Sequence, residues 1–453
     1  MSRPRWLTVV ALIGVLAVFG AACSNNKSSS NPPAGGTESG GNAEQACAAD
    51  EFGCVEVAAG QPIQLGTLLS ITGDTASLGL DSQRGVKLAV DYLDGTLDGK
   101  DGQLLGHDIK LDNEDDGCTA EGGQSGAAKL VGIPNLLAVI GTSCSSAALG
   151  VADKIFSDKG ILLISPSNTN PNLTAEGTHQ DFYLRTAHND TIQGSVMADF
   201  ANKVVKAKTA ATIHDESPYA DALAEVFRAA FELGGGQIVG NEAIQSTDTD
   251  FKPLLTNIGQ NAPDYLYYPD FNPACALIAK QAAGISSLSN TSMGGSDGCG
   301  APDYAKIAGP AADGTFISGP DLTAIVGQND FYKNTFVPAY NKEFNTAPTA
   351  SFHAHAFDAV NILFKAVEES AIKGDDGSLS IPRTALKDAI YATNGYDGLT
   401  GTITCVPLGD CATKVAIAVY KVPDDPFTGG ATNAKPVFSE TKTLEEVEAA
   451  LNG

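Results

Sequence analysis

From Gln61 onward, the sequence alternates short apolar runs with amphipathic helical patterns, and this alternation constrains the fold more than any other feature. Candidate strands begin at Ile63, Asp108, Leu136 and Gly160, and helical patterns lie between them. Repeated β-α-β units of this kind favour a parallel sheet that is covered by helices on both faces. The first series therefore predicts one α/β lobe.

The same alternation begins again after Arg185. A strand is expected at Ala210–His214, and Ser217 with Pro218 makes a good helix start, because Ser caps well and Pro suits the first helical position. Further strands are expected at Ile238–Gly240, Tyr265–Tyr268 and Ser292–Gly294. Two series of similar size predict an α/β chain with two similar Rossmann-like lobes, each built on a parallel sheet.

The C-terminal part of the sequence continues with mixed patterns. Asp330–Ala371 is again helical, Ile403–Cys405 and Val415–Tyr420 suggest a late strand pair, and Glu440–Leu451 has the spacing of an amphipathic helix.

The first 22 residues have the pattern of a secretory signal. Two arginines precede an apolar run from Trp6 to Phe19, which is shorter than the roughly 20 residues that a spanning helix needs. Small residues then lead into Cys23, as in a bacterial lipobox, although Gly20 stands where an apolar residue is usual. We expect the Cys23 thiol to carry lipid. The alternative is an ordinary secretory signal followed by an unrelated cysteine.

Residues 23–60 are predicted to form the lipidated start and a flexible linker. Ser24–Gln45 contains Ser, Asn, Gly and Pro with almost no apolar residue, so it cannot bury a core. No later segment is long and apolar enough to span a bilayer. The predicted location is the outer face of the cytoplasmic membrane or the periplasm, with the lipid as the only membrane attachment.

The net charge of −25 argues against nucleic acid and against an anionic lipid surface as partners. Eight of the nine cysteines remain once Cys23 is set aside, and an even number in an exported chain suggests disulfides. The spacings do not suit zinc. Four local couples stand out, although eight cysteines allow many connectivities: Cys47 and Cys54, Cys118 and Cys144, Cys275 and Cys299, and Cys405 and Cys411.

Polar residues follow two strands of the first series, at the sheet edge where parallel α/β folds bind ligands. Ser145 and Ser146 open a helix after the third strand, where free N–H groups favour a carboxylate or phosphate. A plain helix cap is the alternative. Ser167 and Thr169 follow the fourth strand and offer hydroxyls to a small polar ligand, or simply form a turn.

Taken together, these blocks resemble the leucine/isoleucine/valine-binding proteins of ATP-driven amino-acid importers. The resemblance runs from about Ile63 to Val422, in matching order and spacing. The specific matches are Asp115-Asp-Gly-Cys, Ile140-Gly-Thr-Ser-Cys-Ser-Ser, Gly160-Ile-Leu-Leu-Ile-Ser-Pro, Leu184-Arg-Thr, and Ile213-His-Asp with Tyr219.

The resemblance implies a type I periplasmic-binding fold, with a three-segment hinge between two lobes and a ligand cleft beside it. Lobe 1 is expected to comprise 61–186 and 319–395, lobe 2 to comprise 187–318 and 396–425, and 426–453 to be a tail. Cys118 and Cys144 match a disulfide of the family.

The resemblance also implies roles for individual residues. Ser145 matches the serine that holds the ligand's α-carboxylate, and Ser167 and Thr169 match positions that grip the α-carboxylate and the α-ammonium. Tyr219 matches a tyrosine that lobe 2 contributes on closure. Asp297 falls where the family has a glutamate facing the ammonium.

Two departures from the family affect the expected side-chain pocket. Leu78 and Phe271 stand where the family protein has tyrosines, so both positions lose a hydroxyl. They indicate an apolar pocket.

The implied function is the capture of a branched-chain or hydrophobic amino acid for an ABC permease, with no cofactor, no metal and no catalysis. One alternative keeps the fold and makes the chain a sensor of amides, urea or aromatic acids for a signalling partner. An exported hydrolase is the other. His353 and His355 are two residues apart and share no helix face, which disfavours a metal pair. The acidic run Asp112–Asp116 lacks EF-hand spacing.

Overall fold

The computed structural model describes residues 39–324, 329–426 and 434–453. Its first large sheet has the strand order β3-β4-β2-β5-β6-β7, and every pairing from β4 to β7 is parallel. The strands are β2 (Ile63–Leu69), β3 (Gln103–Leu104), β4 (His107–Asp115), β5 (Leu136–Gly141), β6 (Leu162–Ser165) and β7 (Tyr183–Arg185). We call this sheet and its helices the first lobe.

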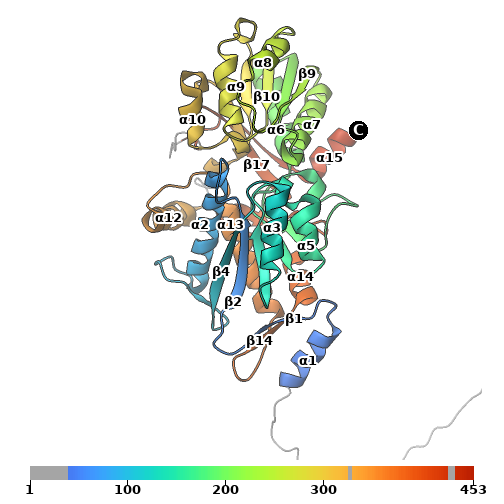
Figure 1. Ribbon diagram of the computed structural model, residues 1–453, viewed down its shortest axis with the longest axis vertical. Helices are drawn as coiled ribbons and strands as arrows, with labels where there is room; N and C mark the ends of the chain where they lie inside the picture. Colours follow the sequence, from blue (N-terminus) through green and yellow to red (C-terminus); the bar gives the residue numbers. More distant parts are fainter. Residues whose placement is uncertain (1–38, 325–328, 427–433) are drawn as a thin grey trace, which may run out of the picture. The chain divides into compact units, whose positions relative to one another are not determined.

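The strands of the first lobe contribute side chains to two different hydrophobic cores. In β6, Leu162 and Ile164 join the core under α2 and α13, whereas Leu163 joins the core under α3 and α5. Figure 1 shows α2 beside α13, and these two helices are in contact. The helices are α2 (Ala76–Asp91), α3 (Ala120–Leu130), α4 (Ser145–Ala147), α5 (Asp153–Ser157), α12 (Val337–Phe344), α13 (His353–Ser370) and α14 (Arg383–Tyr391). Helices on both faces explain why the strands are apolar throughout.

The second large sheet has the order β18-β17-β12-β11-β10-β8-β9 and forms the second lobe. Its strands from β9 to β12 are parallel, and β17 and β18 are antiparallel. The strands are β8 (Thr209–His214), β9 (Gln237–Ala243), β10 (Tyr265–Tyr268), β11 (Ser292–Gly295), β12 (Phe316–Pro320), β17 (Lys414–Lys421) and β18 (Phe438–Thr443). The helices are α6 (Asp190–Asp199), α7 (Pro218–Leu233), α8 (Lys252–Gly259), α9 (Ala274–Ala282), α10 (Asp303–Ala308) and α15 (Leu444–Asn452).

The expected α/β architecture of two lobes is therefore confirmed, and α7 illustrates its local cause. The Ser217 side chain accepts a hydrogen bond from Ala220 N, and Pro218 occupies the first turn. Leu223, Phe227 and Phe231 recur at helical spacing and are fully buried. The predicted start of this helix is confirmed.

The chain passes between the two sheets three times. The first crossing lies between β7 and α6, the second between β12 and α12, and the third between β16 (Gly401–Ile403) and β17. In the third crossing, Cys411 N donates to Arg185 O, and Arg185 N donates to Gly409 O, so this segment lies against the first crossing.

The C-terminal part differs from the sequence expectation. Residues 438–443 form β18, an edge strand of the second sheet, and only 444–452 are helical. The predicted helix start at Glu440 is wrong, because β17 offers an antiparallel partner and Thr443 caps the helix with Glu446 in a capping box. The predicted late strand pair is also wrong: β16 pairs with β15 (Tyr396–Gly398), and β17 pairs with β12 and β18.

Part of the expected linker is also structured. Residues 39–49 form α1, and β1 (Cys54–Val57) pairs with β14 (Leu379–Pro382) in a small sheet of the first lobe, with β13 (Ile372–Lys373) on its other side. Val55 and Val57 are buried there. The signal peptide, the start of the linker and the lipid-attachment residue Cys23 lie outside the described residues. Among the residues described, no helix has the length and apolar character to cross a membrane.

Four disulfides join the four local cysteine couples. They are Cys47–Cys54, Cys118–Cys144, Cys275–Cys299 and Cys405–Cys411. The last of these closes the loop of the third crossing, next to Asp410.

Candidate functional site

In the first lobe, the hydroxyls after β5 and β6 lie in one buried network. Ser145 Oγ accepts from Asn170 N at 3.3 Å, and Ser167 Oγ donates to Ser143 O at 2.9 Å. The Thr169 hydroxyl is buried beside the Asp190 carboxyl. The helix that begins at Ser145 is only three residues long, so its N-terminal field is weaker than the sequence suggested.

Arg185 holds the loop that carries these hydroxyls. Its buried guanidinium pairs with Asp410 at 2.5 Å and donates to Asn170 O at 2.8 Å and to Thr174 Oγ1 at 2.7 Å. Because Asp410 belongs to the third crossing, this ion pair fastens the first-lobe loop to the hinge. Arg185 belongs to the Leu184-Arg-Thr block, for which the family resemblance implied no role.

In the second lobe, two donors orient the Asp297 carboxylate. Tyr219 Oη lies 2.9 Å from Asp297 Oδ1, and Gln193 Nε2 donates to the same oxygen at 2.7 Å. Both contacts fall on Oδ1. Within the described part of the chain, Oδ2 therefore remains available to a ligand.

Apolar side chains lie beside Asp297. The rings of Tyr219 and Phe271 have centroids 5.0 Å apart. Leu78 from the first lobe and Phe271 and Asp297 from the second lobe line one small cavity of about 20 Å³. The structure thus brings together a carboxylate and an apolar wall contributed by both lobes, which we call the cleft.

The remaining predicted residues approach the cleft without lining this cavity. Tyr219 hydrogen-bonds to Asp297, which lines the cavity. Ser145, Ser167 and Thr169 belong to the first lobe. Asn170 connects the two groups, because its backbone N–H contacts Ser145 and its side-chain amide donates to Pro218 O at the start of α7.

Two buried polar residues near the site were not predicted. The Asp190 carboxyl is fully buried beside the Thr169 side chain, and its burial, together with the nearby charge of Asp297, raises its pKa well above the usual range. Gln193 is also buried, three residues further along α6. Nine of the ten residues in α6 are buried, so its sequence has no polar face that would mark these two residues as functional.

His353 of the disfavoured metal pair and His214 of the Ile213-His-Asp block occupy separate environments. His353 Nδ1 lies 2.8 Å from Asp81, and its Nε2 lies 2.7 Å from the Tyr332 hydroxyl, so its ring is fully engaged. His214 lies 3.6 Å from Asp221 at the end of β8. Among the described residues, the one group with metal-ligand spacing is Cys47, Cys54 and Glu56, and its two cysteines form a disulfide.

Comparison with known proteins shows the family of this chain. A family model described as periplasmic binding protein matches residues 62–424. The Leu/Ile/Val-binding protein BraC3 of Rhizobium johnstonii is 30% identical over 360 residues, which cover 79% of this chain and 91% of that protein. This chain belongs to the Leu/Ile/Val-binding protein family.

Two further relatives of this binding protein agree with the assignment. Leu/Ile/Val-binding protein homolog 3 of Brucella melitensis is 29% identical over 81% of this chain and 93% of its own length. The crystal structure of a leucine-binding protein from Thermotoga maritima matches with a TM-score of 0.70 and 25% identity, over 85% of this chain and 99% of that one. The family consists of solute-binding proteins.

Proposed function

We propose that this chain is the extracytoplasmic receptor of an ABC importer and that it captures a small hydrophobic amino acid in the cleft. The observation that carries the proposal is the Asp297 carboxylate, which is oriented through one oxygen and lies beside Leu78 and Phe271. An α-ammonium pairs with such a carboxylate, and an apolar side chain packs on Leu78 and Phe271. The names of the relatives from Rhizobium and Brucella support the same ligand class.

The first-lobe hydroxyls would bind the other end of the amino acid. Ser145 and Ser167 would offer hydrogen bonds to the α-carboxylate, and the buried hydroxyl of Thr169 would contact either polar group. Charge-assisted hydrogen bonds are about twice as strong as neutral ones, and exclusion of water between the lobes strengthens them further.

Ligand access requires the lobes to separate. The cleft cavity of about 20 Å³ is far below the roughly 300 Å³ at which small-molecule sites begin. We therefore expect hinge opening at the three crossings, followed by closure over the amino acid. The closed form would then be the one that the permease recognises.

The membrane attachment completes the proposal. Lipid on Cys23 would hold the receptor near its permease and raise the local concentration of the closed form there. This is the only membrane contact that the proposal needs.

Calorimetry tests the ligand class. The mature protein, unfolded and refolded to remove any co-purified ligand, is titrated with leucine, isoleucine, valine, phenylalanine, acetamide, urea and benzoate. We expect one molecule of a hydrophobic amino acid to bind per chain, with no product formed. Binding of benzoate or an amide, with no amino acid bound, would overturn the proposed ligand class.

A further inference from the structure

A second cavity, of about 370 Å³, lies at the hinge and contains none of the residues assigned to the cleft. Segments at the crossings border it: His188 from the first, Asp321 from the second, and Lys414–Ile417 of β17, where the third crossing ends. The β15–β16 hairpin and Thr441 of β18 complete its wall. Its volume is within the range of small-molecule sites. We call it the hinge cavity.

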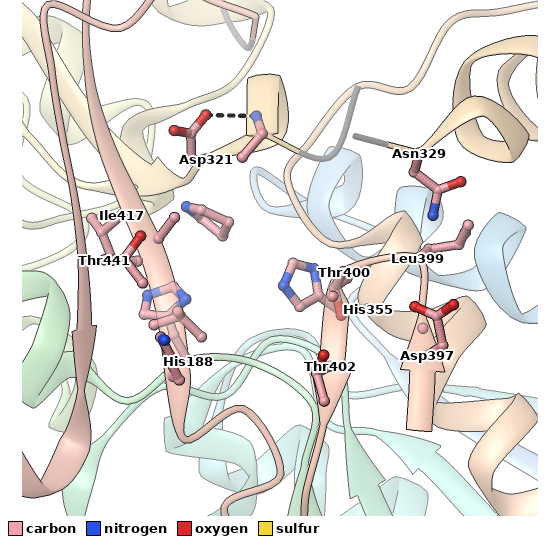
Figure 2. Close-up of a pocket in the computed structure, with 17 residues that line it drawn as sticks. His188, Asp321, Asn329, His355, Asp397, Leu399, Thr400, Thr402, Ile417 and Thr441 are labelled. Atoms are coloured by element: carbon pink, nitrogen blue, oxygen red, sulfur yellow. Dashed lines mark hydrogen bonds between the residues drawn. The ribbon is translucent and has the colours of Figure 1, made fainter. Parts of the chain in front are cut away.

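Two buried imidazoles border the hinge cavity. His188 is 1% exposed and His355 is 5% exposed, and the Nδ1 atom of each lacks a hydrogen-bond partner among the described residues. Figure 2 shows the two rings at the wall of the cavity. A buried polar atom without a partner destabilises the protein, so an occupant that pairs with these nitrogens gains stability from the contact.

The hydrogen bonds around His188 determine which partner its Nδ1 needs. Gln193 Nε2 donates to Asp297 at 2.7 Å, so the Gln193 amide oxygen faces His188 Nε2 and accepts from it. The proton of the neutral ring therefore resides on Nε2, and Nδ1 is an acceptor. An occupant must present an O–H or N–H group to this atom.

The charges around the hinge cavity favour a neutral occupant. Burial lowers the pKa of His188, and it lowers the pKa of His355 to about 3, so both rings are uncharged at neutral pH. Asp321 is already engaged by Thr323, Tyr420 and Ser439. The remaining ionisable lining residues, Asp397 and Lys414, are exposed and opposite in sign.

Hydroxyl groups line the opening. Figure 2 shows Thr441 on the β17–β18 side and Thr402 on the hairpin side, whereas the Thr400 hydroxyl nearby already donates to Asp358. Thr402 and Thr441 are exposed. Together with the acceptor on His188, they match a molecule that carries several hydroxyls. We propose that the hinge cavity is an accessory binding site for a small neutral polyol or monosaccharide, separate from the amino-acid cleft.

Ligand-observed NMR tests this inference with glycerol, myo-inositol and glucose as separate probes at millimolar concentration. The mature protein is used without any cleft ligand, so the outcome does not depend on the proposed function. We expect saturation transfer to at least one probe. A crystal soaked in that probe should show one of its hydroxyls within hydrogen-bond distance of His188 Nδ1.

Two variants locate the binding. Thr402→Trp and Thr441→Trp each place a large side chain at the opening from an exposed position, and each should abolish saturation transfer. Thr247→Trp, at an exposed turn between β9 and α8, is the matched control and should leave it intact. The inference is overturned if no probe gives a signal, which means that the cavity holds water alone. A signal that persists in both variants overturns it as well.

Discussion

The orientation of Asp297 depends on individual donors rather than on the fold as a whole. Tyr219 and Gln193 both contact Oδ1, and His188 in turn fixes the Gln193 amide. The sequence predicted Asp297 and Tyr219 through the family resemblance. It could not predict Gln193, because a glutamine on a helix that is buried on all sides has no periodic signature.

Asp116 is a second residue whose role follows from its surroundings. It is fully buried and accepts hydrogen bonds from Cys118 N at 2.8 Å and Ser143 N at 2.6 Å, beside the Cys118–Cys144 disulfide. Burial raises its pKa to about 7. The folded protein therefore retains a proton that the unfolded chain, with a carboxyl pKa near 3.8, loses earlier.

This shift predicts a pH dependence of stability. The contribution of the raised Asp116 pKa to the free energy of unfolding is fully present below about pH 4. It is lost as the pH rises toward 7, because the unfolded state binds fewer protons than the folded state over that range. Urea unfolding of the wild type and of Asp116→Asn across this range measures it. The variant should be less stable by about 1–3 kcal/mol, since one N–H loses its acceptor, and its stability should change less with pH. Equal slopes for the two proteins would contradict this assignment.

At the scale of elements, strands and helices with a clear period were predictable. The start of α7 and the strands β2, β5, β8 and β10 follow from sequence pattern. The β18–α15 boundary could not be predicted from the sequence, because Glu440–Leu451 has helical spacing throughout. Its first residues form a strand because they pair with the edge of β17. Tertiary context outweighed local pattern there.

The crossings are held together by Arg185 and Asp410. Because the pair is buried, Asp410→Asn leaves the Arg185 charge uncompensated and should lower the free energy of unfolding by about 3–5 kcal/mol. Asp158→Asn, which breaks the exposed pair with Lys154, should cost less than about 1 kcal/mol. Urea denaturation compares them. Similar losses for the two variants would show that the buried pair does not stabilise the hinge.

At the scale of the whole molecule, the family resemblance predicted two lobes, three crossings and a cleft. It did not predict the hinge cavity, whose lining comes from segments far apart in the sequence, from His188 to Thr441. No periodicity links such residues. The small sheet formed by β1, β13 and β14 was missed for the same reason, since β1 finds its partner more than 300 residues later.

The lipid anchor is tested on the intact precursor. Cys23→Ala should release the protein from the membrane fraction when it is expressed in a bacterium that processes lipoproteins, while amino-acid binding stays unchanged. Mass spectrometry of the wild-type N-terminus should find acyl chains on Cys23. A wild-type protein that is cleaved at another residue, or that lacks acyl chains, would exclude the anchor without affecting the cleft.

The central claim is that Asp297 pairs with the ammonium of an amino acid. Calorimetry tests it most directly with the tightest-binding amino acid and the same molecule without its amino group, for example leucine and 4-methylpentanoate, in the wild type and in Asp297→Asn. Asp303→Asn, at an exposed position of α10, is the control. We predict that Asp297→Asn weakens amino-acid binding by about 1.5–3 kcal/mol and leaves binding of the analogue nearly unchanged. Equal losses for both ligands, or no loss for either, would contradict the claim.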